Sequence, residues 1–283
     1  MRPTVLIPCH RRTDLLRLAL DAVREHPVLV VDDSADGLSL GSVACIRTTG
    51  SVGFSRAVNQ GLAALEEQDV LHALLLNDDA QPEPGCIQAL VAAWTEQDDG
   101  ALAPVLVDTA GGLSTGFVVS RTGRVRVRAG DLEVPTEVDA VSGAAMLIRT
   151  RERLDEGYRH GFEDLELCRR LKARGLAVRT IPQARCRHAG GATVSRQSRF
   201  AQRTAVAGHM RYLGGGWRSG VAVALSVGQV LLEGGSPSRM LGVLDGWRDH
   251  RRGAQPSEGV PSRAARAWAA SMAGPRPGSR STR

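Results

Sequence analysis

Apolar, β-type runs alternate with helix-type segments over the first hundred residues, and this alternation constrains the fold more than any other feature of the 283-residue chain. The β-type runs cover residues 4–8, 28–33, 44–47 and 71–77, and helical periodicity covers 13–23, 55–67 and 85–96. Strands that alternate with helices in this way form a parallel sheet whose faces are covered by helices. We therefore predict an α/β domain.

The predicted strands of this domain end in polar residues. These residues are Cys9 and His10 after the first strand, Asp32 and Asp33 at the end of the second, and Asn77, Asp78 and Asp79 after the strand at 71–77. In open α/β sheets, ligands bind beyond the carboxyl ends of the strands, where loops and helix N-termini converge. We expect these polar residues to meet at one edge of the sheet.

The rest of the chain changes character twice. Short extended pieces with Gly-rich turns occupy 101–150, followed by a helix at 162–175, a last strand at 177–182, and two or three helices within 196–250. Residues 253–283 are rich in Pro, Gly, Ser and Arg, which is typical of a disordered basic tail. We divide the chain into an α/β domain (1–215), a C-terminal helical extension (216–252) and this tail.

Charge and cysteine usage narrow the class of protein. A formal charge of +6 favours anionic partners such as nucleotides, phosphates or a lipid surface, although a merely soluble surface would give the same balance. The five cysteines are scattered, which argues against a disulfide framework or a zinc knuckle and indicates a reducing compartment. We find no signal-peptide-like stretch at the N-terminus and expect a cytoplasmic protein, with association to a membrane left open.

The segment 220–234 comes closest to a membrane segment. It is apolar but shorter than the roughly 18 residues that a spanning helix needs. It is either a buried helix or a helix that lies on a bilayer surface.

Asp78 and Asp79 stand directly after an apolar strand in "LLLNDDAQPEPG". Two acids at such a position need solvent, a partner or a cation. Mg²⁺ and Mn²⁺ take oxygen ligands and often use one or two carboxylates together with the phosphate oxygens of a substrate. Since Asn, Asp, Pro and Gly also form turns, the same residues equally suit a turn without chemistry.

The segments around residues 30–62 add weaker signals. Asp32 and Asp33 can bind a ribose or a base, or close an Asx turn. Gly53 precedes a helix whose first turn carries Arg56, an arrangement suited to a diphosphate, although no P-loop sequence follows. Asn59 is a poor helix former, so it is a pocket residue or a surface amide.

Two later segments complete the candidate set. Glu163 and Asp164 begin a helix, where acids commonly complement the helix dipole; an ionised Asp at the sheet edge can also act as a general base. His188 follows a strand and is either structural or a last ligand to a cation held by Asp79.

Taken in order, these segments resemble the family-2 glycosyltransferases of the GT-A fold, particularly the rhamnosyltransferase-like branch. The matching segments span residues 4–194 and read VLIPCHRR, VVDDS, GSVGFSRAVNQGL, LLLNDDAQPEPG, VSGAAMLIR, GFEDLELCRRL and RHAGGAT. The later GVLDGWRDHRRG also looks like the end of such chains.

The resemblance implies a GT-A, Rossmann-like mixed sheet and an inverting hexosyl or deoxyhexosyl transferase. Such an enzyme uses Mg²⁺ or Mn²⁺ to move a sugar from a dTDP-, UDP- or GDP-sugar to an acceptor hydroxyl. By motif position, the donor-binding residues are Pro8, His10, Asp32, Asp33, Gly53, Arg56, Asn59, Asn77 and Asp78. The metal ligands are Asp79 and His188, and the base is Asp164 beside Glu163.

One departure from the family pattern affects the metal. Asn77 stands at the first position of the acidic D-x-D motif, which leaves fewer anionic ligands and predicts weak metal affinity in the absence of the donor. The resemblance further requires that Asp79 and Asp164 face the same cleft.

Other functions remain open from the sequence. One alternative is transfer to a polyprenyl phosphate at the membrane, an acceptor that needs no base. Another is a protein that binds nucleotide sugars without turnover. A nucleotidyltransferase would need a Gly-rich triphosphate loop, which the HRR segment at 10–12 lacks. Paired acids also suit glycoside hydrolysis, but a hydrolase does not need the polar strand ends that are typical of nucleotide binding. We expect no nucleic-acid partner.

Overall fold

A computed structural model of the chain describes residues 1–10, 13–34, 36–158, 161–189, 198–214, 217–232 and 237–253. The predicted basic tail lies outside the described residues except for Gly253. The end of the RHAGGAT segment, from Gly190 onwards, also lies outside them.

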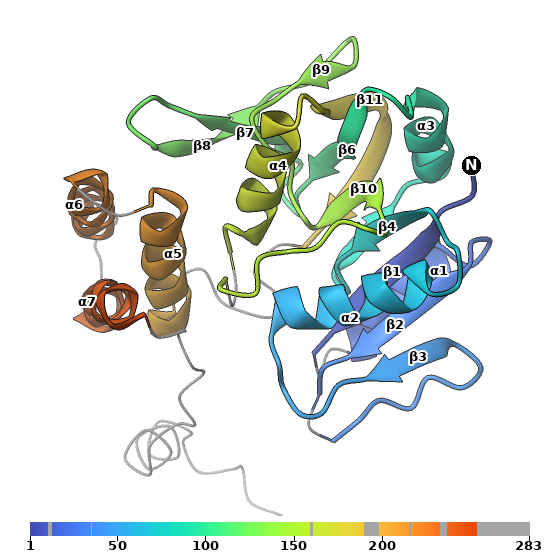
Figure 1. Cartoon of the computed structure of the whole chain (residues 1–283), viewed down its shortest axis with the longest axis horizontal. Coiled ribbons are helices and arrows are strands. Elements are labelled where there is room, and N and C mark those ends of the chain that lie inside the picture. The colour runs from blue at the N-terminus through green and yellow to red at the C-terminus, as the bar shows by residue number, and fades with distance from the viewer. Residues whose placement is uncertain are drawn as a thin grey trace, which may run out of the picture.

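An eleven-stranded mixed sheet forms the centre of the molecule (Figure 1). Its strands are β1 (Thr4–Cys9), β2 (Val28–Asp32), β3 (Ala44–Arg47), β4 (His72–Leu76), β5 (Ala80–Pro82), β6 (Asp99–Val107), β7 (Leu113–Val119), β8 (Val125–Ala129), β9 (Thr136–Glu137), β10 (Ala145–Arg149) and β11 (Ala177–His188). The main path runs β3-β2-β1-β4-β10-β6-β11-β5, with β7 and β8 attached to β6, and β9 to β11. Strands β3, β2, β1 and β4 are parallel, whereas β10 runs antiparallel to both of its neighbours.

Helices cover both faces of this sheet, and three more follow it. They are α1 (Thr13–Ala22), α2 (Phe54–Glu66), α3 (Cys86–Ala93), α4 (Glu163–Ala173), α5 (Arg199–Tyr212), α6 (Trp217–Leu232) and α7 (Pro237–Arg252). The predicted α/β class is therefore confirmed, with the antiparallel β10 making the sheet mixed.

The alternation of side chains along the central strands builds two cores, one on each face of the sheet. Val5 and Ile7 of β1 point to the face that α1 and α3 cover, in a cluster with Leu16 and Leu90. Leu6, between them, points to the opposite face, which α2 and α4 cover. Because successive residues of a strand face opposite sides, a strand buried on both sides is apolar along its length, as β1 and β4 are after their first residues, Thr4 and His72.

The polar strand ends meet at one edge of the sheet, as expected. Cys9 at the end of β1 is paired with Asp32 at the end of β2, and the Asp33 N–H donates to the Cys9 carbonyl at 2.9 Å. On the other side of β1, the Asn77 N–H after β4 donates to the carbonyl of Ala144, just before β10, at 2.9 Å. The antiparallel direction of β10 thus brings its start to the edge where the parallel strands end.

Three element predictions are corrected. The Asp-Pro-Gly composition predicts only a turn after Asp79, but Ala80–Pro82 form β5, an edge strand where a proline needs no ladder hydrogen bond. The last strand does not end at residue 182: after a register shift between Ile181 and Arg185, β11 pairs with β6 again and reaches His188. Helix α3 ends at Ala93 rather than 96, because Trp94 adopts an extended conformation.

Helices α5, α6 and α7 form a separate apolar cluster beside the sheet (Figure 1). Its members are Val206 and Met210 of α5, Val230 of α6 and Val243 of α7. Helix α5 also contacts the sheet domain, since Arg169 of α4 donates to the Tyr212 carbonyl at 2.6 Å. The boundary near residue 215 stays a prediction.

Candidate functional site

The carboxylate of Asp32 is fully buried at the end of β2 and bonded to the loop that follows it. Its Oδ1 accepts hydrogen bonds from the Ser34 N–H and hydroxyl, and its Oδ2 accepts from the Leu38 N–H at 2.7 Å and from Arg47 at 3.3 Å. Burial acts to raise the pKa of Asp32, but these hydrogen bonds and the Arg47 charge outweigh it and lower the pKa. Asp32 is thus held ionised and closes an Asx turn.

The carboxylate of Asp33 anchors the loop that leads into α2. Its Oδ1 accepts from the Thr48 hydroxyl and from the Val52 N–H, each at 2.7 Å, and its Oδ2 accepts from the Gly53 N–H at 3.0 Å. Gly53 has φ 92°, which favours glycine. His10 lies against the same segment, with its Nδ1 2.8 Å from the Asp33 carbonyl oxygen. Pro8 is buried in β1, opposite Val31.

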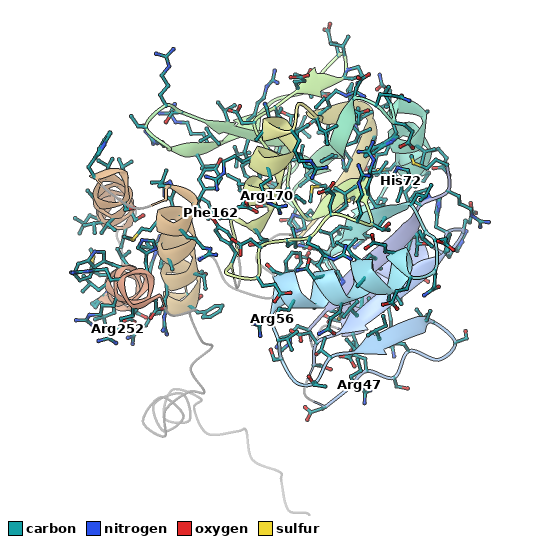
Figure 2. All side chains as sticks on the ribbon, in the orientation of Figure 1. Arg47, Arg56, His72, Phe162, Arg170 and Arg252 are labelled. Carbon is teal, nitrogen blue, oxygen red and sulfur yellow. The ribbon has the colours of Figure 1, made fainter. Side chains whose placement is uncertain are left out.

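Helix α2 supports the segment 154–158, which precedes α4 in the chain. Asn59 is buried, and its amide donates to the Leu154 carbonyl at 2.9 Å and accepts from the Leu154 N–H at 2.8 Å. Arg56 is half exposed and pairs with Glu156 at 3.1 Å (Figure 2). Asn59 is therefore no surface amide, and its side chain positions the backbone of Leu154.

The residues after β4 form a turn at the same edge. The Ala80 N–H donates to the Asn77 carbonyl at 3.1 Å, so the turn and the acids coexist. The Oδ1 of Asn77 is buried and has no hydrogen-bond partner among the described residues. Asp78 and Asp79 are both buried.

Asp79 lies against the end of β11. Its Oδ1 is 3.1 Å from the Nε2 of His188, and its carbonyl accepts from the Ala189 N–H at 3.1 Å. The pairing of β5 with β11, in which Ala80 faces His188, fixes this contact.

The first two acids of α4 have different surroundings: Glu163 is buried, and Asp164 is half-buried. Asp164 Oδ2 accepts from the Gly143 N–H at 3.0 Å, and its Oδ1 accepts from the Leu165 N–H at 2.8 Å. Glu163 Oε2 is buried and has no hydrogen-bond partner among the described residues. The environment thus favours a charge on Asp164 over a charge on Glu163.

The pKa values of both acids are raised, and the causes are separable. Burial, reinforced by the negative charge of neighbouring Asp164, raises the pKa of Glu163 to about 8. Burial also raises the pKa of Asp164, but the hydrogen bonds from Gly143 and Leu165 oppose that shift. Glu163 is therefore mostly protonated at neutral pH, whereas the two backbone hydrogen bonds favour the charged form of Asp164 against the effect of burial.

An unusual backbone conformation positions the start of α4. Gly161 has φ 85° and Phe162 has φ 74°, a left-handed conformation that is rare for an aromatic residue. The Phe162 ring is held between α4 and α5 (Figure 2), stacked on His209 with ring centroids 5.0 Å apart. Helix α5 thus stabilises the turn that points Glu163 and Asp164 toward the sheet edge.

Most of the sequence-predicted residues gather at this edge, through short bonded links. Asp164 is bonded to Gly143, whose neighbour Ala144 is bonded to Asn77, two residues before Asp79. On the other side of β1, His10 and Gly53 lie against Asp33. Arg56 and Asn59 lie one step away and face the 154–156 segment.

The donor set at Asp79 fits a weakly held divalent cation. Two adjacent ligands at about 2.1 Å from an octahedral ion lie about 3 Å apart, close to the 3.1 Å between Asp79 and His188. The Oδ1 of Asn77, two residues before Asp79 in the chain, is buried and has no hydrogen-bond partner among the described residues. The described residues contain no cluster of three or more His, Cys, Asp or Glu suited to a metal. The remaining ligands would have to come from solvent or substrate.

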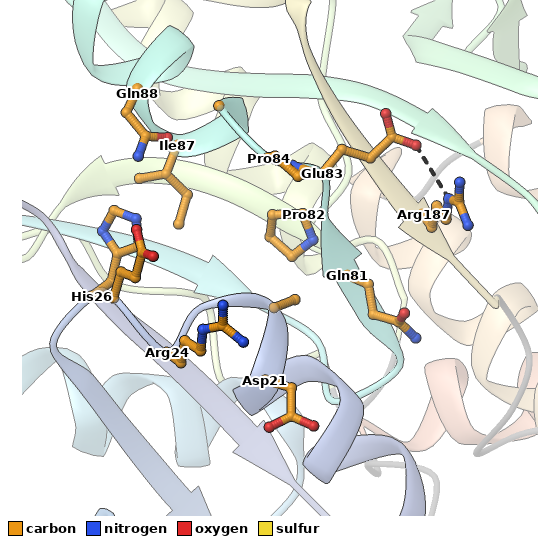
Figure 3. Close-up of a pocket in the computed structure, with 13 residues that line it drawn as sticks. Asp21, Arg24, His26, Gln81, Pro82, Glu83, Pro84, Ile87, Gln88 and Arg187 are labelled. Atoms are coloured by element: carbon orange, nitrogen blue, oxygen red, sulfur yellow. Dashed lines mark hydrogen bonds and ion pairs between the residues drawn. The ribbon is translucent and has the colours of Figure 1, made fainter.

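A separate cleft of about 730 Å³ opens on the α1 and α3 side of the sheet (Figure 3). Arg24 and His26 line one wall, and Gln81 and Glu83 line another. Glu83 pairs with Arg187 at 3.2 Å, so the charges in the cleft are mixed. Its lining includes none of the sequence-predicted site residues, and we do not assign it to the site.

Sequence reasoning assigns no role to two residues that position Asp164. Gly143 supplies the N–H that orients the carboxylate, and Phe162 sets the start of the helix. The signal for Gly143 is its place between an apolar segment and a buried strand. Phe162 carries no such signal, because its left-handed conformation depends on packing against α5.

Comparisons with known proteins agree with this fold. The structure of GalNAc-T7 with UDP, GalNAc and Mn²⁺ superposes with a TM-score of 0.56 at 14% identity, over 75% of this chain and 47% of that one. S. aureus TarS gives a TM-score of 0.48 at 14% identity, over 72% of this chain and 38% of that one. The chain thus spans less than half of the length of either protein. A search of curated proteins gave no match.

The sequence comparison identifies the family directly. The profile described as glycosyl transferase family 2 matches residues 4–151, which include strands β1 to β10 and the Asn77–Asp79 turn. The mixed sheet flanked by helices is the GT-A fold. Because the match covers more than half of the chain, this protein belongs to glycosyl transferase family 2.

Proposed function

We propose that the protein is an inverting, metal-dependent glycosyltransferase of the rhamnosyltransferase-like branch. It moves a hexosyl or deoxyhexosyl group from a dTDP-, UDP- or GDP-sugar to an acceptor hydroxyl in the cytoplasm. The observation that carries the proposal is the bonded link from Asp164 through Gly143 and Ala144 to Asn77. It supports a site in which the acids of α4 and the turn after β4 work on one substrate.

Asp164 is the proposed general base. An acceptor hydroxyl loses its proton readily only as its oxygen attacks, so it needs a carboxylate that is ionised and correctly oriented. The hydrogen bonds from Gly143 and Leu165 hold both oxygens of Asp164 and favour its charged form. Glu163 keeps the proton of the pair and so spares Asp164 a second negative charge beside it.

Asp79 and His188 are the proposed ligands of Mg²⁺ or Mn²⁺. A bound divalent cation supplies positive charge to the diphosphate that leaves the sugar. Asp79 offers a carboxylate oxygen and His188 a ring nitrogen, and Asn77 adds a neutral oxygen. With only one anionic ligand in direct reach, metal binding is expected to depend on the donor's phosphates.

In this proposal, the backbone of two loops, and not the carboxylates of Asp32 and Asp33, contacts the nucleoside of the donor. The carboxylates of Asp32 and Asp33 are occupied by the loops at 34–38 and 48–53. The donor's base and ribose are therefore expected to contact these loops and His10. The role of Asp32 and Asp33, like that of Asn59 and Gly53, is then to position the backbone of the pocket. Pro8, Arg56 and Asp78 remain proposed members of the same pocket.

A thermal-shift screen tests the proposal. UDP-, dTDP- and GDP-sugars are added to the full chain with and without Mn²⁺, because a ligand that binds only the folded state raises the Tm by mass action. One donor should raise the Tm, and Mn²⁺ should enlarge that shift. Asp79→Ala should lose the Mn²⁺ contribution, whereas Asp98→Ala, which changes an exposed acid in the turn between α3 and β6, should keep it. The absence of any Mn²⁺-dependent shift would refute the site assignment.

A second candidate is transfer to a polyprenyl phosphate at a membrane. The exposed apolar residues of α6 and α7 favour it. A phosphate acceptor is already an anion and needs no base, so this candidate predicts that Asp164→Asn keeps its transfer activity. Binding of nucleotide sugars without turnover is separated from both by the release of nucleoside diphosphate in the presence of acceptors.

A further inference from the structure

Helix α6 has an apolar side exposed to solvent. Trp217 is 70% exposed, Leu231 64% and Leu225 44%. Gly220 and Ala224, also exposed, fall on the same stripe at helical spacing. Residues 219–232 contain no charged side chain at all. A surface helix normally carries polar residues on its solvent side, so an apolar stripe exposed to solvent is unusual.

Helix α7 continues the same kind of surface. Gly242 and Gly246 face α5 so closely that an added Cβ would collide with its backbone carbonyls. The opposite side of α7 is exposed: Leu241 by 45%, Leu244 by 40% and Trp247 by 36%. We call these three residues, together with Trp217, Leu225 and Leu231 of α6, the outer face.

The inner sides of both helices are already occupied, so the outer face is not an unfinished contact with α5. Val223, Val227 and Val230 of α6 pack in the cluster formed with α5 and α7. Figure 1 shows α6 and α7 next to each other, with α5 between them and the sheet. The outer face is therefore the side of this helical unit that looks away from α5.

Positive charge lies at one end of the outer face. The two acids of α7 are turned to α5, where Asp245 pairs with Arg199 at 2.5 Å and Asp249 with Arg203. Arg251 and Arg252, in the last turn, are exposed, and Arg251 lies over the Trp247 ring at 5.1 Å. Arg252 is labelled at the outer edge of the molecule in Figure 2.

We propose that the outer face of α6 and α7 binds the surface of an anionic lipid bilayer, with both helices lying in the plane of the membrane. In such a contact, tryptophans lie at the level of the lipid headgroups and leucines lie below them, while arginines bind the acidic headgroups. No described helix is long and apolar enough to cross a membrane, which agrees with an in-plane position. The proposal does not depend on the transfer reaction.

Vesicle flotation of the full chain tests the proposal. The protein should float with vesicles made of equal amounts of phosphatidylcholine and phosphatidylglycerol, less with phosphatidylcholine alone, and less at high salt. The double variant Trp217→Ser, Leu231→Gln should lose binding to both vesicles. Arg251→Glu with Arg252→Glu should weaken only the binding to anionic vesicles, by at least about fivefold for each arginine.

Matched control variants lie on α1, in the sheet domain. Leu18→Gln and Arg17→Glu change exposed residues of the same types and should float like wild type. Tm values confirm that all variants are folded. Wild type that floats with neither vesicle, or outer-face variants that float as well as the controls, would overturn the proposal. So would a dimer in light scattering that Leu231→Gln dissociates, because a second copy would then cover this face.

Discussion

The Oδ2 atom of Asp164 accepts a hydrogen bond from the Gly143 N–H at 3.0 Å. This bond joins the first turn of α4 to the segment that precedes β10, and the next residue of that segment is bonded to Asn77. It orients one carboxylate among several at this edge of the sheet. A Cβ added at Gly143 would lie 3.5 Å from the Asp164 Cβ, which is an ordinary van der Waals contact.

Replacement of Asp164 separates binding from chemistry. Asp164→Asn keeps an oxygen for the Gly143 N–H but removes the proton acceptor. We expect kcat to fall by about 10² to 10⁴, with the donor-induced Tm shift unchanged. The measurements are nucleoside diphosphate release and thermal shift on the same preparation. Asp98→Asn, in an exposed turn, serves as the control and should retain wild-type kcat.

Glu163 makes stability depend on pH. Its pKa is raised from 4.5 to about 8, so between these values the native state holds a proton that the unfolded state has lost. The free energy of unfolding contributed by Glu163 is complete below about pH 4.5 and is lost as the pH rises through about 8. The slope is at most about 1.4 kcal/mol per pH unit.

Glu163→Gln removes this slope, because glutamine is neutral in both states. Denaturant unfolding at pH 5 and pH 8 should show that the variant gains stability relative to wild type as the pH rises. Glu133→Gln changes an exposed glutamate and should leave the pH dependence of wild type intact. Parallel curves for wild type and Glu163→Gln would contradict a protonated Glu163.

Asp33 is expected to matter for the fold even without a donor. Asp33→Ala leaves the Val52 and Gly53 N–H groups without their acceptor, whereas the Thr48 hydroxyl keeps the Gly50 carbonyl at 2.6 Å. We expect a loss of about 2–4 kcal/mol in the free energy of unfolding, measured by denaturant titration of the ligand-free protein. Asp36→Ala, three residues along and exposed, should cost little. If both variants unfold like wild type, Asp33 serves only the nucleotide.

Two glycines of the helical unit should respond in opposite directions. In Gly246→Ala, the new Cβ collides with the Arg203 carbonyl oxygen on α5, and we expect a loss of about 1–3 kcal/mol. Gly228 of α6 has no atom within 4 Å of an added Cβ, so Gly228→Ala should stabilise by about 0.5–1 kcal/mol. Thermal unfolding of the two variants compares them directly, and equal shifts would argue against close α5–α7 packing.

The position of the site was predictable because it follows from strand direction. Parallel strands must end at one edge, so Asp32 and Asp33 and the turn at Asn77 had to lie near each other once the strands were recognised. The likeness of the ordered motifs to a known family extended this to Asp164. Helix and strand types over the first hundred residues follow from hydrophobic periodicity alone.

The bonding state of each carboxylate was not predictable in the same way. Whether Asp33 is open to a ligand or occupied by loop N–H groups depends on how residues 48–53 fold over it. Strand β5 was missed because its partner, the second half of β11, lies a hundred residues away, past Pro182. Contacts between distant parts of the chain determine both the bonding of Asp33 and the formation of β5. The local sequence does not show which parts of the chain make these contacts.

The contacts of α2 connect the Asp33 loop with the segment that precedes α4. Helix α2 begins at the loop held by Asp33, and its side chains grip the backbone at both Leu154 and Tyr158, just ahead of α4. Because these contacts all lie in the N-terminal half of α2, a displacement of the Asp33 loop is expected to move the segment 154–158 with it. A donor that shifts the loop held by Asp33 should therefore also shift Glu163 and Asp164. The expected result is a change in the pH profile of turnover.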